Sequence, residues 1–145
     1  AVNFTDETVK EAQQVVLRMQ MAYKQAALKL QASGIDLEKG KPVYINKFLE
    51  ALADDLNTAN ALAELYNILK DINQQIRSKE TDFVLLNNLF KTLTDMFYVL
   101  GLDINYVKFD DEISSLYKEY LLSKENKDFA KSDEIRKILI EKGVM

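Results

Sequence analysis

The residues of this chain that could bind another molecule gather near its C-terminal end. Phe129 follows Lys127 and Asp128, with Lys124 just upstream and Lys131 within one helical turn. An aromatic ring surrounded by cations is the combination that a stacked nucleobase and its phosphates require. The same pattern also suits a structural role, in which Phe129 pins two short helices together. Residue types and spacing leave both interpretations open.

A carboxylate and two further cations follow Phe129 in the sequence, namely Asp133, Arg136 and Lys137. A guanidinium group can hold a phosphate or a base edge through paired hydrogen bonds, and a carboxylate can accept one from an exocyclic amine. The alternative is an ion pair between Asp133 and Arg136 on a solvated helix face. From spacing alone, the ion pair is the simpler interpretation.

The composition excludes most catalytic chemistry. The 145 residues include no His, no Cys and no Trp, and only four Gly. This excludes thiol nucleophiles, disulfides, imidazole bases and imidazole-ligated zinc, and leaves no phosphate-binding glycine loop. The adjacent carboxylates Asp54 and Asp55 would point in different directions on a helix and are expected to be a solvated helix end. We expect no catalysis by this chain alone.

Localisation and charge give weaker indications. No apolar run approaches the ~20 residues of a membrane span, and the polar N-terminal residues do not resemble a signal peptide, so we expect a soluble cytoplasmic protein. The net charge is -4. Acidic residues concentrate in the segment 48–112, whereas both flanks are slightly basic. This is not the basic patch that is typical of nucleic-acid binding.

Apolar residues recur at spacings of three and four, which predicts helices throughout. Ser33-Gly34, Gly101 and Lys142-Gly143 are expected to end helices, and Thr5, Thr58, Thr81 or Asp82 to cap them. The expected helices and their inward residues are: 6–33 with Val9, Ala12, Val16, Met19, Tyr23, Ala26 and Leu30; 44–55 with Phe48, Leu49 and Leu52; 58–76 with Leu62, Leu65, Leu69, Ile72 and Ile76; 82–100 with Phe83, Leu86, Leu89, Phe90, Leu93, Met96, Phe97 and Leu100; 110–123 with Ile113, Leu116, Tyr117 and Tyr120; and 128–142 with Phe129, Ile135, Ile138 and Leu139.

This pattern predicts an all-α protein. No segment alternates with a period of two, so no sheet is expected. We expect an antiparallel four-helix bundle over residues 1–101 and an appended helical hairpin over residues 110–145.

Two segments resemble bacterial cysteinyl-tRNA synthetases. Residues 48–62, FLEALADDLNTANAL, are similar to a block that opens a helix of the bundle following that family's catalytic domain. Residues 127–136, KDFAKSDEIR, followed by Leu139 and Gly143-Val144, are similar to the family's C-terminal signature. The chain departs from the family pattern at Lys124 and Tyr120, where Arg is common, and at Ala59, where Pro is usual.

The resemblance implies a DALR-type bundle that packs against the acceptor-side domains and the inner face of the tRNA, with a C-terminal module that reads the GCA anticodon. By this resemblance Lys124 would contact anticodon bases, Phe129 would stack on one, and Asp133 would accept a hydrogen bond from a base edge. The cations Lys127, Lys131, Arg136 and Lys137 would position the RNA backbone.

The implied partners are the cysteine tRNA and the catalytic domain of the same enzyme, with no membrane and no DNA. ATP and zinc would be used only in that catalytic domain, upstream of Ala1. The alternative function is a helical protein-interaction or structural bundle with no RNA role, which the charge distribution slightly favours.

Overall fold

A computed structural model describes residues 6–54 and 58–145 of the chain. Within these residues the regular structure is entirely helical, which confirms the predicted fold class. The capping side chains expected at Thr5 and Thr58, the carboxylate of Asp55 and the inward side chains of Val9 and Ala12 lie outside the described part. The elements are α1 (Asp6–Ala32), the short 3-10 helix η1 (Leu37–Lys39), α2 (Asn46–Ala53), α3 (Thr58–Arg77), α4 (Phe83–Leu100), α5 (Asp111–Glu125) and α6 (Phe129–Glu141).

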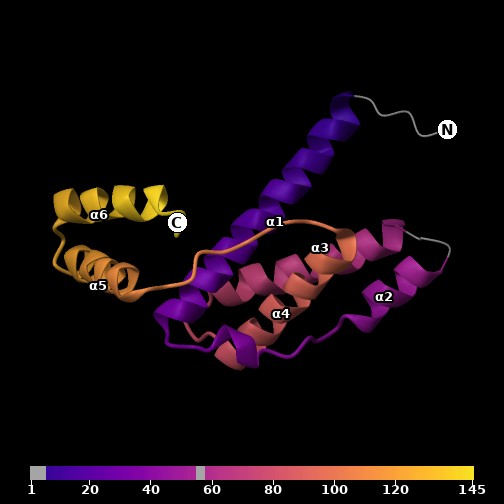
Figure 1. Ribbon diagram of the computed structural model, residues 1–145, viewed down its shortest axis with the longest axis horizontal. Coiled ribbons are helices and arrows are strands. Elements are labelled where there is room, and N and C mark those ends of the chain that lie inside the picture. Colours follow the sequence, from indigo (N-terminus) through magenta and orange to yellow (C-terminus); the bar gives the residue numbers. More distant parts are fainter. Residues whose placement is uncertain (1–5, 55–57) are drawn as a thin grey trace.

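The main hydrophobic core lies where α1, α3 and α4 pack against one another, and α2 packs on α3 (Figure 1). At its centre the ring of Tyr23 stacks on Phe90 with centroids 4.4 Å apart. Tyr106, from the segment after α4, meets both rings edge-on. Of the described side chains on α1, none before Met19 is buried, so the N-terminal turns of this helix extend beyond the core.

Local sequence signals account for most helix ends. The carboxylates of Asp82, Asp110 and Asp128 accept hydrogen bonds from the backbone of the first turn of α4, α5 and α6. Gly101 and Gly143 take up positive φ angles where α4 and α6 end, as predicted. Three bounds differ from the sequence prediction by two residues, because α2 begins at Asn46 rather than Tyr44 and ends at Ala53 rather than Asp55, and α5 continues to Glu125.

Five residues that were expected to face inward are exposed. Leu49, Leu62, Leu100 and Ile138 keep between 38% and 41% of their surface accessible, and Phe129 keeps 60%. Each belongs to an apolar stripe, but the facing helix does not cover the stripe at that position. The other phenylalanines assigned to the core follow the prediction, since Phe48, Phe90 and Phe97 are buried and Phe83 packs against the core.

The hairpin formed by α5 and α6 has a small apolar cluster of its own, which includes Ile113, Ile135 and Leu139. Leu28 of α1 packs against this cluster. The side-chain amide of Gln31 donates to the carbonyl oxygen of Val107 at 3.0 Å and accepts from the backbone N–H of Phe109 at 2.8 Å. This double hydrogen bond fixes the connector between α4 and α5 to α1 just before α5 begins, and so places the hairpin beside the C-terminal end of α1 (Figure 1).

None of the helices in the described part of the chain is both long and apolar enough to cross a membrane.

Candidate nucleic-acid interface

Every residue that the sequence singled out for RNA binding is exposed on the α5–α6 hairpin. Lys124 lies in the last turn of α5, Lys127 lies in the turn between the helices, and Phe129 is the first residue of α6. Phe129 keeps 60% of its surface accessible and does not belong to the apolar cluster of the hairpin. Phe129 is therefore not part of the buried cluster that joins the two helices.

The start of α6 explains why Phe129 points outward. The carboxylate of Asp128 accepts from the backbone N–H of Lys131 at 3.3 Å and caps the helix. Ser132, Ile135 and Leu139 then face α5 and are buried. Because these three positions define the inward face, the helical repeat leaves Phe129 at the edge of the solvent-facing side.

The helix brings four of the candidate residues onto one stripe. Phe129, Asp133, Arg136 and Lys137 fall within about 100° of one another around the axis of α6 at 3.6 residues per turn. Lys131 lies about 160° away from Phe129 around the same axis, on the opposite flank of the buried face. The structure thus collects a ring, a carboxylate and two cations on one surface, and separates Lys131 from them.

The cations of this stripe have no ionic partner within the described residues. The two ion pairs there join Lys91 to Asp95 and Lys142 to Glu112. The ion pair considered between Asp133 and Arg136 is consequently not formed. Both side chains are exposed and available to a ligand.

The ammonium of Lys124 lies over an aromatic ring of α5. Its Nζ atom lies 5.3 Å from the centroid of the Tyr120 ring, a distance at which the ring attracts a cation. Tyr120 in turn neighbours Tyr117, and burial together with Tyr120 raises the pKa of the Tyr117 hydroxyl above its ordinary value of 10.0. Tyr120 therefore supports the side chain of Lys124.

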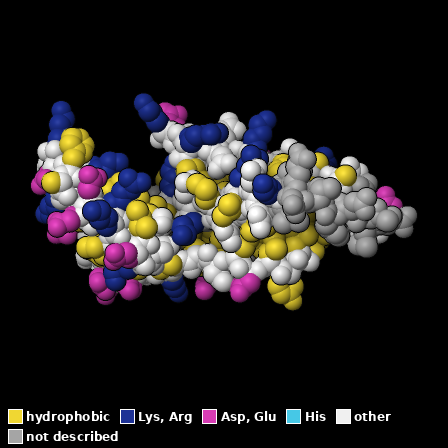
Figure 2. Space-filling view, turned by 90° about the horizontal axis from the view of Figure 1, so that it is seen from above, with side chains coloured by type: hydrophobic (Ala, Val, Ile, Leu, Met, Phe, Trp, Pro, Cys, Tyr) yellow, Lys and Arg dark blue, Asp and Glu magenta, His cyan; other side chains and the backbone are white. Residues whose placement is uncertain are grey.

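Charges of both signs alternate over the hairpin. Figure 2 shows basic and acidic side chains interspersed at the α5–α6 end of the molecule, without a continuous field of one sign. Long-range attraction of a polyanion is correspondingly weak, and binding must depend on local contacts.

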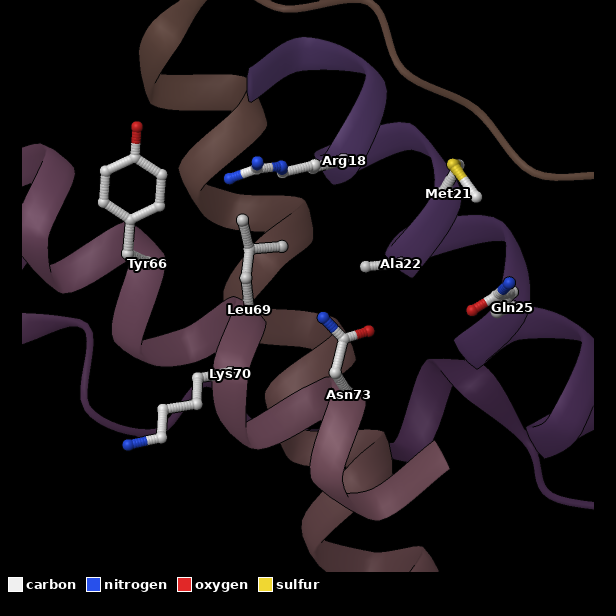
Figure 3. A pocket seen from close by; sticks show the side chains of 8 residues that line it. All are labelled: Arg18, Met21, Ala22, Gln25, Tyr66, Leu69, Lys70 and Asn73. Carbon is white, nitrogen blue, oxygen red and sulfur yellow. The ribbon is translucent and has the colours of Figure 1, made fainter. Parts of the chain in front are cut away.

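Sequence reasoning missed a groove between α1 and α3 with a volume of about 340 Å³ (Figure 3). Arg18, Gln25, Tyr66, Lys70 and Asn73 line it together with three apolar residues, and none of the lining residues is acidic. Such a lining suits an anion, because a guanidinium, an ammonium and two amides can all donate hydrogen bonds. The sequence carries no signal for this groove, since its walls come from helices about fifty residues apart and meet only in the folded chain.

Lys70 also borders a second groove, of about 550 Å³, that opens between the start of α2 and α3. Tyr44 stands at its edge with a φ of +58°, an unusual angle for a bulky residue. Glu64 and Asp71 line this groove together with Lys47, so its charge is mixed. Among the described residues, no group of three or more acidic, Cys or His side chains could hold a metal ion.

The middle of the chain is similar to a known domain family. Residues 47–105, which run from α2 through α4 into the connector, match the model of the DALR domain family. No solved structure matches the chain.

Nearly the whole chain aligns with cysteine–tRNA ligases of Bacillus species. The proteins of Bacillus thuringiensis (strain Al Hakam), Bacillus cereus (strain AH820) and Bacillus anthracis (strain A0248) are each 31% identical over 155 residues, covering 99% of this chain and 32% of the relative. The chain thus spans about a third of the length of the curated relatives that it matches. Residues 47–105 are thus similar to the DALR domain family, and the chain as a whole is similar to about a third of the length of the cysteine–tRNA ligases.

Proposed function

We propose that this chain is the tRNA-binding part of a cysteine–tRNA ligase and that its α5–α6 hairpin receives the anticodon of the cysteine tRNA. The observation that carries the proposal is the 60% exposure of Phe129 on a stripe that also presents Asp133, Arg136 and Lys137. The ring lies outside the apolar cluster of the hairpin, and cations and a carboxylate accompany it, which is the combination that a stacked base and its phosphates require.

The proposed mechanism assigns a separate task to each side chain. Anticodon bases are single-stranded and can unstack, so one base can lie on the ring of Phe129. Asp133, one turn further along the same stripe, can accept a hydrogen bond from an exocyclic amine and so distinguish one base from another. Arg136 and Lys137 can neutralise the adjacent phosphates, which orients the RNA without reading its sequence.

The rest of the chain holds this surface in place. We assign residues 1–101 to a helical bundle that includes the DALR match, and residues 110–145 to the anticodon module. The separate buried clusters of the two parts support this division. The hydrogen bonds of Gln31 to the connector at Val107 and Phe109 orient the hairpin relative to α1. Activation of cysteine with ATP, and any zinc site, would belong to a catalytic domain with which this chain works.

The deciding experiment titrates the fluorescently labelled 145-residue chain with two transcripts of equal length and charge. One is the cysteine tRNA with its GCA anticodon, and the other differs only in the three anticodon bases. We expect tighter binding of the GCA transcript. Affinity should fall with salt at a log–log slope of roughly -3, if about four phosphates are neutralised.

Equal affinity for the two transcripts would contradict anticodon recognition by this hairpin. A slope near zero would contradict the phosphate contacts. Because the transcripts carry the same charge, a difference between them reports base recognition and not general attraction to RNA.

A further inference from the structure

One turn in the hairpin uses a residue that its geometry disfavours. α1, α4, α5 and α6 all end in a Schellman motif, in which two backbone N–H groups beyond the helix bond back to carbonyl groups of its last turn. In α5 these bonds run from Asp128 to Ser123 at 2.8 Å and from Lys127 to Lys124 at 3.1 Å. The same pair of bonds ends the other three helices at Gly34, Gly101 and Gly143.

The residue at the left-handed position differs only in α5. Gly34, Gly101 and Gly143 have φ angles of +76°, +70° and +78°, whereas Lys127 has a φ of +59°. In an L-residue this conformation brings Cβ close to the following carbonyl oxygen, which glycine avoids. Lysine also lacks the short polar side chain that makes the conformation tolerable for asparagine. The chain therefore uses glycine at three equivalent turns and gives up stability at the fourth.

No contact within the described residues shows that Lys127 stabilises the hairpin. Its side chain is exposed, and its ammonium makes neither a hydrogen bond nor an ion pair there. The position lies two residues before Phe129, so the two Cα atoms are at most about 7 Å apart. The ammonium can reach a phosphate that flanks a base lying on the Phe129 ring.

We infer that Lys127 is a phosphate-binding residue for which the α5–α6 turn gives up conformational stability. This rests on the proposed function of the hairpin. The inference adds that the same lysine lowers the stability of the turn and raises the affinity for RNA. Replacing it with glycine should improve the fold and impair the binding.

The test compares Lys127→Gly with the unmodified chain by two readouts. Amide hydrogen exchange across residues 111–141 should slow by about 5- to 30-fold, because relief of a left-handed L-residue is typically worth one or two kcal/mol. The affinity for the cysteine tRNA should fall, and the log–log salt slope should become less steep by about 0.7, which corresponds to one lost phosphate contact.

Three further variants separate charge from backbone strain. Lys127→Asn keeps a residue that tolerates the conformation but removes the cation, and should lose the same salt dependence. Lys127→Arg keeps the cation and should preserve affinity. Gly34→Lys places a lysine in the same motif at the end of α1, where an added Cβ meets nothing within 4 Å. It should accelerate exchange there without any gain in affinity.

Two results would overturn the inference while leaving the proposed function intact. One is unchanged affinity and salt slope in Lys127→Gly while Phe129→Ala still weakens binding. The other is unchanged or faster exchange in Lys127→Gly, which would show that the lysine is not strained. If the unmodified chain fails to prefer the GCA transcript, the proposed function fails first and the inference fails with it.

Discussion

The Nζ atom of Lys29 lies 2.7 Å from the carbonyl oxygen of Ile76, so that a cation on α1 caps the C-terminus of α3. The same ammonium donates to the carbonyl oxygens of Gln75 at 3.1 Å and Ser78 at 3.2 Å. These carbonyls carry the negative end of the helix dipole and have no partner within α3. One side chain thereby joins two helices that are separated by almost fifty residues of sequence.

Replacement of Lys29 by Met should destabilise the protein by about 1–2 kcal/mol, because three carbonyl groups lose a charged donor while the aliphatic part of the side chain is kept. Urea denaturation followed by circular dichroism would measure the change. Lys24→Met is a matched control on the same helix, since Lys24 makes no hydrogen bond or ion pair with the described residues. A similar loss in both variants would contradict the capping role.

Thr92 should be more sensitive to loss of its hydroxyl than to loss of its methyl group. Its side chain is fully buried, and Oγ1 accepts from the backbone N–H of Val43 at 2.7 Å. The hydroxyl also lies 2.8 Å from the Val43 carbonyl and 3.0 Å from that of Asn88, and donates to one of them. Thr92→Val should therefore cost about 1–3 kcal/mol by leaving the Val43 N–H buried and unpaired.

Thr92→Ser keeps these hydrogen bonds and loses one methyl group, which should cost about 1 kcal/mol. Chemical denaturation of both variants distinguishes the two effects. If the serine variant is as unstable as the valine variant, packing and not the hydrogen bond holds this segment against α4.

Stability should decline in alkaline solution. Burial raises the pKa of the Tyr23 hydroxyl above its ordinary value of 10.0, an effect that the hydrogen bond to Thr94 opposes and Tyr106 reinforces. Burial likewise raises the pKa of Tyr117. The unfolded chain then releases these protons at lower pH than the folded chain. The free energy of unfolding is thus unaffected below pH 10 and falls as the pH rises through the folded pKa values.

Denaturant titrations between neutral pH and about pH 11 would reveal this decline. Tyr23→Phe should make the decline of stability with pH shallower, because the variant lacks one of the two buried hydroxyl groups. Tyr98→Phe, which alters an exposed tyrosine, should leave it unchanged. An identical decline in all three proteins would place its origin outside the aromatic core.

Phe129→Ala should weaken binding of the cysteine tRNA by about 1–3 kcal/mol through the loss of base stacking. Its effect on folding should stay within about 0.5 kcal/mol, because the ring lies outside the hairpin core. Leu122→Ala is a control of equal exposure, since both side chains are 60% accessible. Fluorescence titration gives the affinity, and hydrogen exchange of α5 and α6 shows whether the hairpin stays folded. Loss of exchange protection in Phe129→Ala would contradict the assignment.

The two flanks of α6 should respond differently to loss of a cation. Lys137 shares the stripe with Phe129, whereas Lys131 lies on the opposite flank. Lys137→Gln should therefore make the salt slope of tRNA binding less steep by about 0.7, while Lys131→Gln leaves it unchanged. Equal effects from the two substitutions would show that RNA contacts both sides of the helix.

The helices could be predicted from the sequence, because the residues that begin and end a helix act on a few neighbouring residues only. The capping carboxylates of Asp82, Asp110 and Asp128 and the terminal glycines Gly101 and Gly143 operate as their types predict. Exposure at Leu49 and Leu62 was predicted wrongly, because an apolar stripe shows which face of a helix can be buried and not how far a neighbour covers it. The cluster around Phe129 was found for a related reason: its members lie within one short helix and the preceding turn.

The sequence by itself determined the helical class, most helix ends and the residues of the candidate RNA surface, since each depends on neighbours along the chain. Tertiary structure alone decided that the face of α6 with Phe129 stays exposed, because packing on α5 buries the face with Ser132, Ile135 and Leu139 instead. It also produced the Lys29 cap on α3, the Gln31 hydrogen bonds to the connector and the groove beside Arg18. Those features join residues that are distant in sequence, and their positions follow from how the helices pack and not from any local preference.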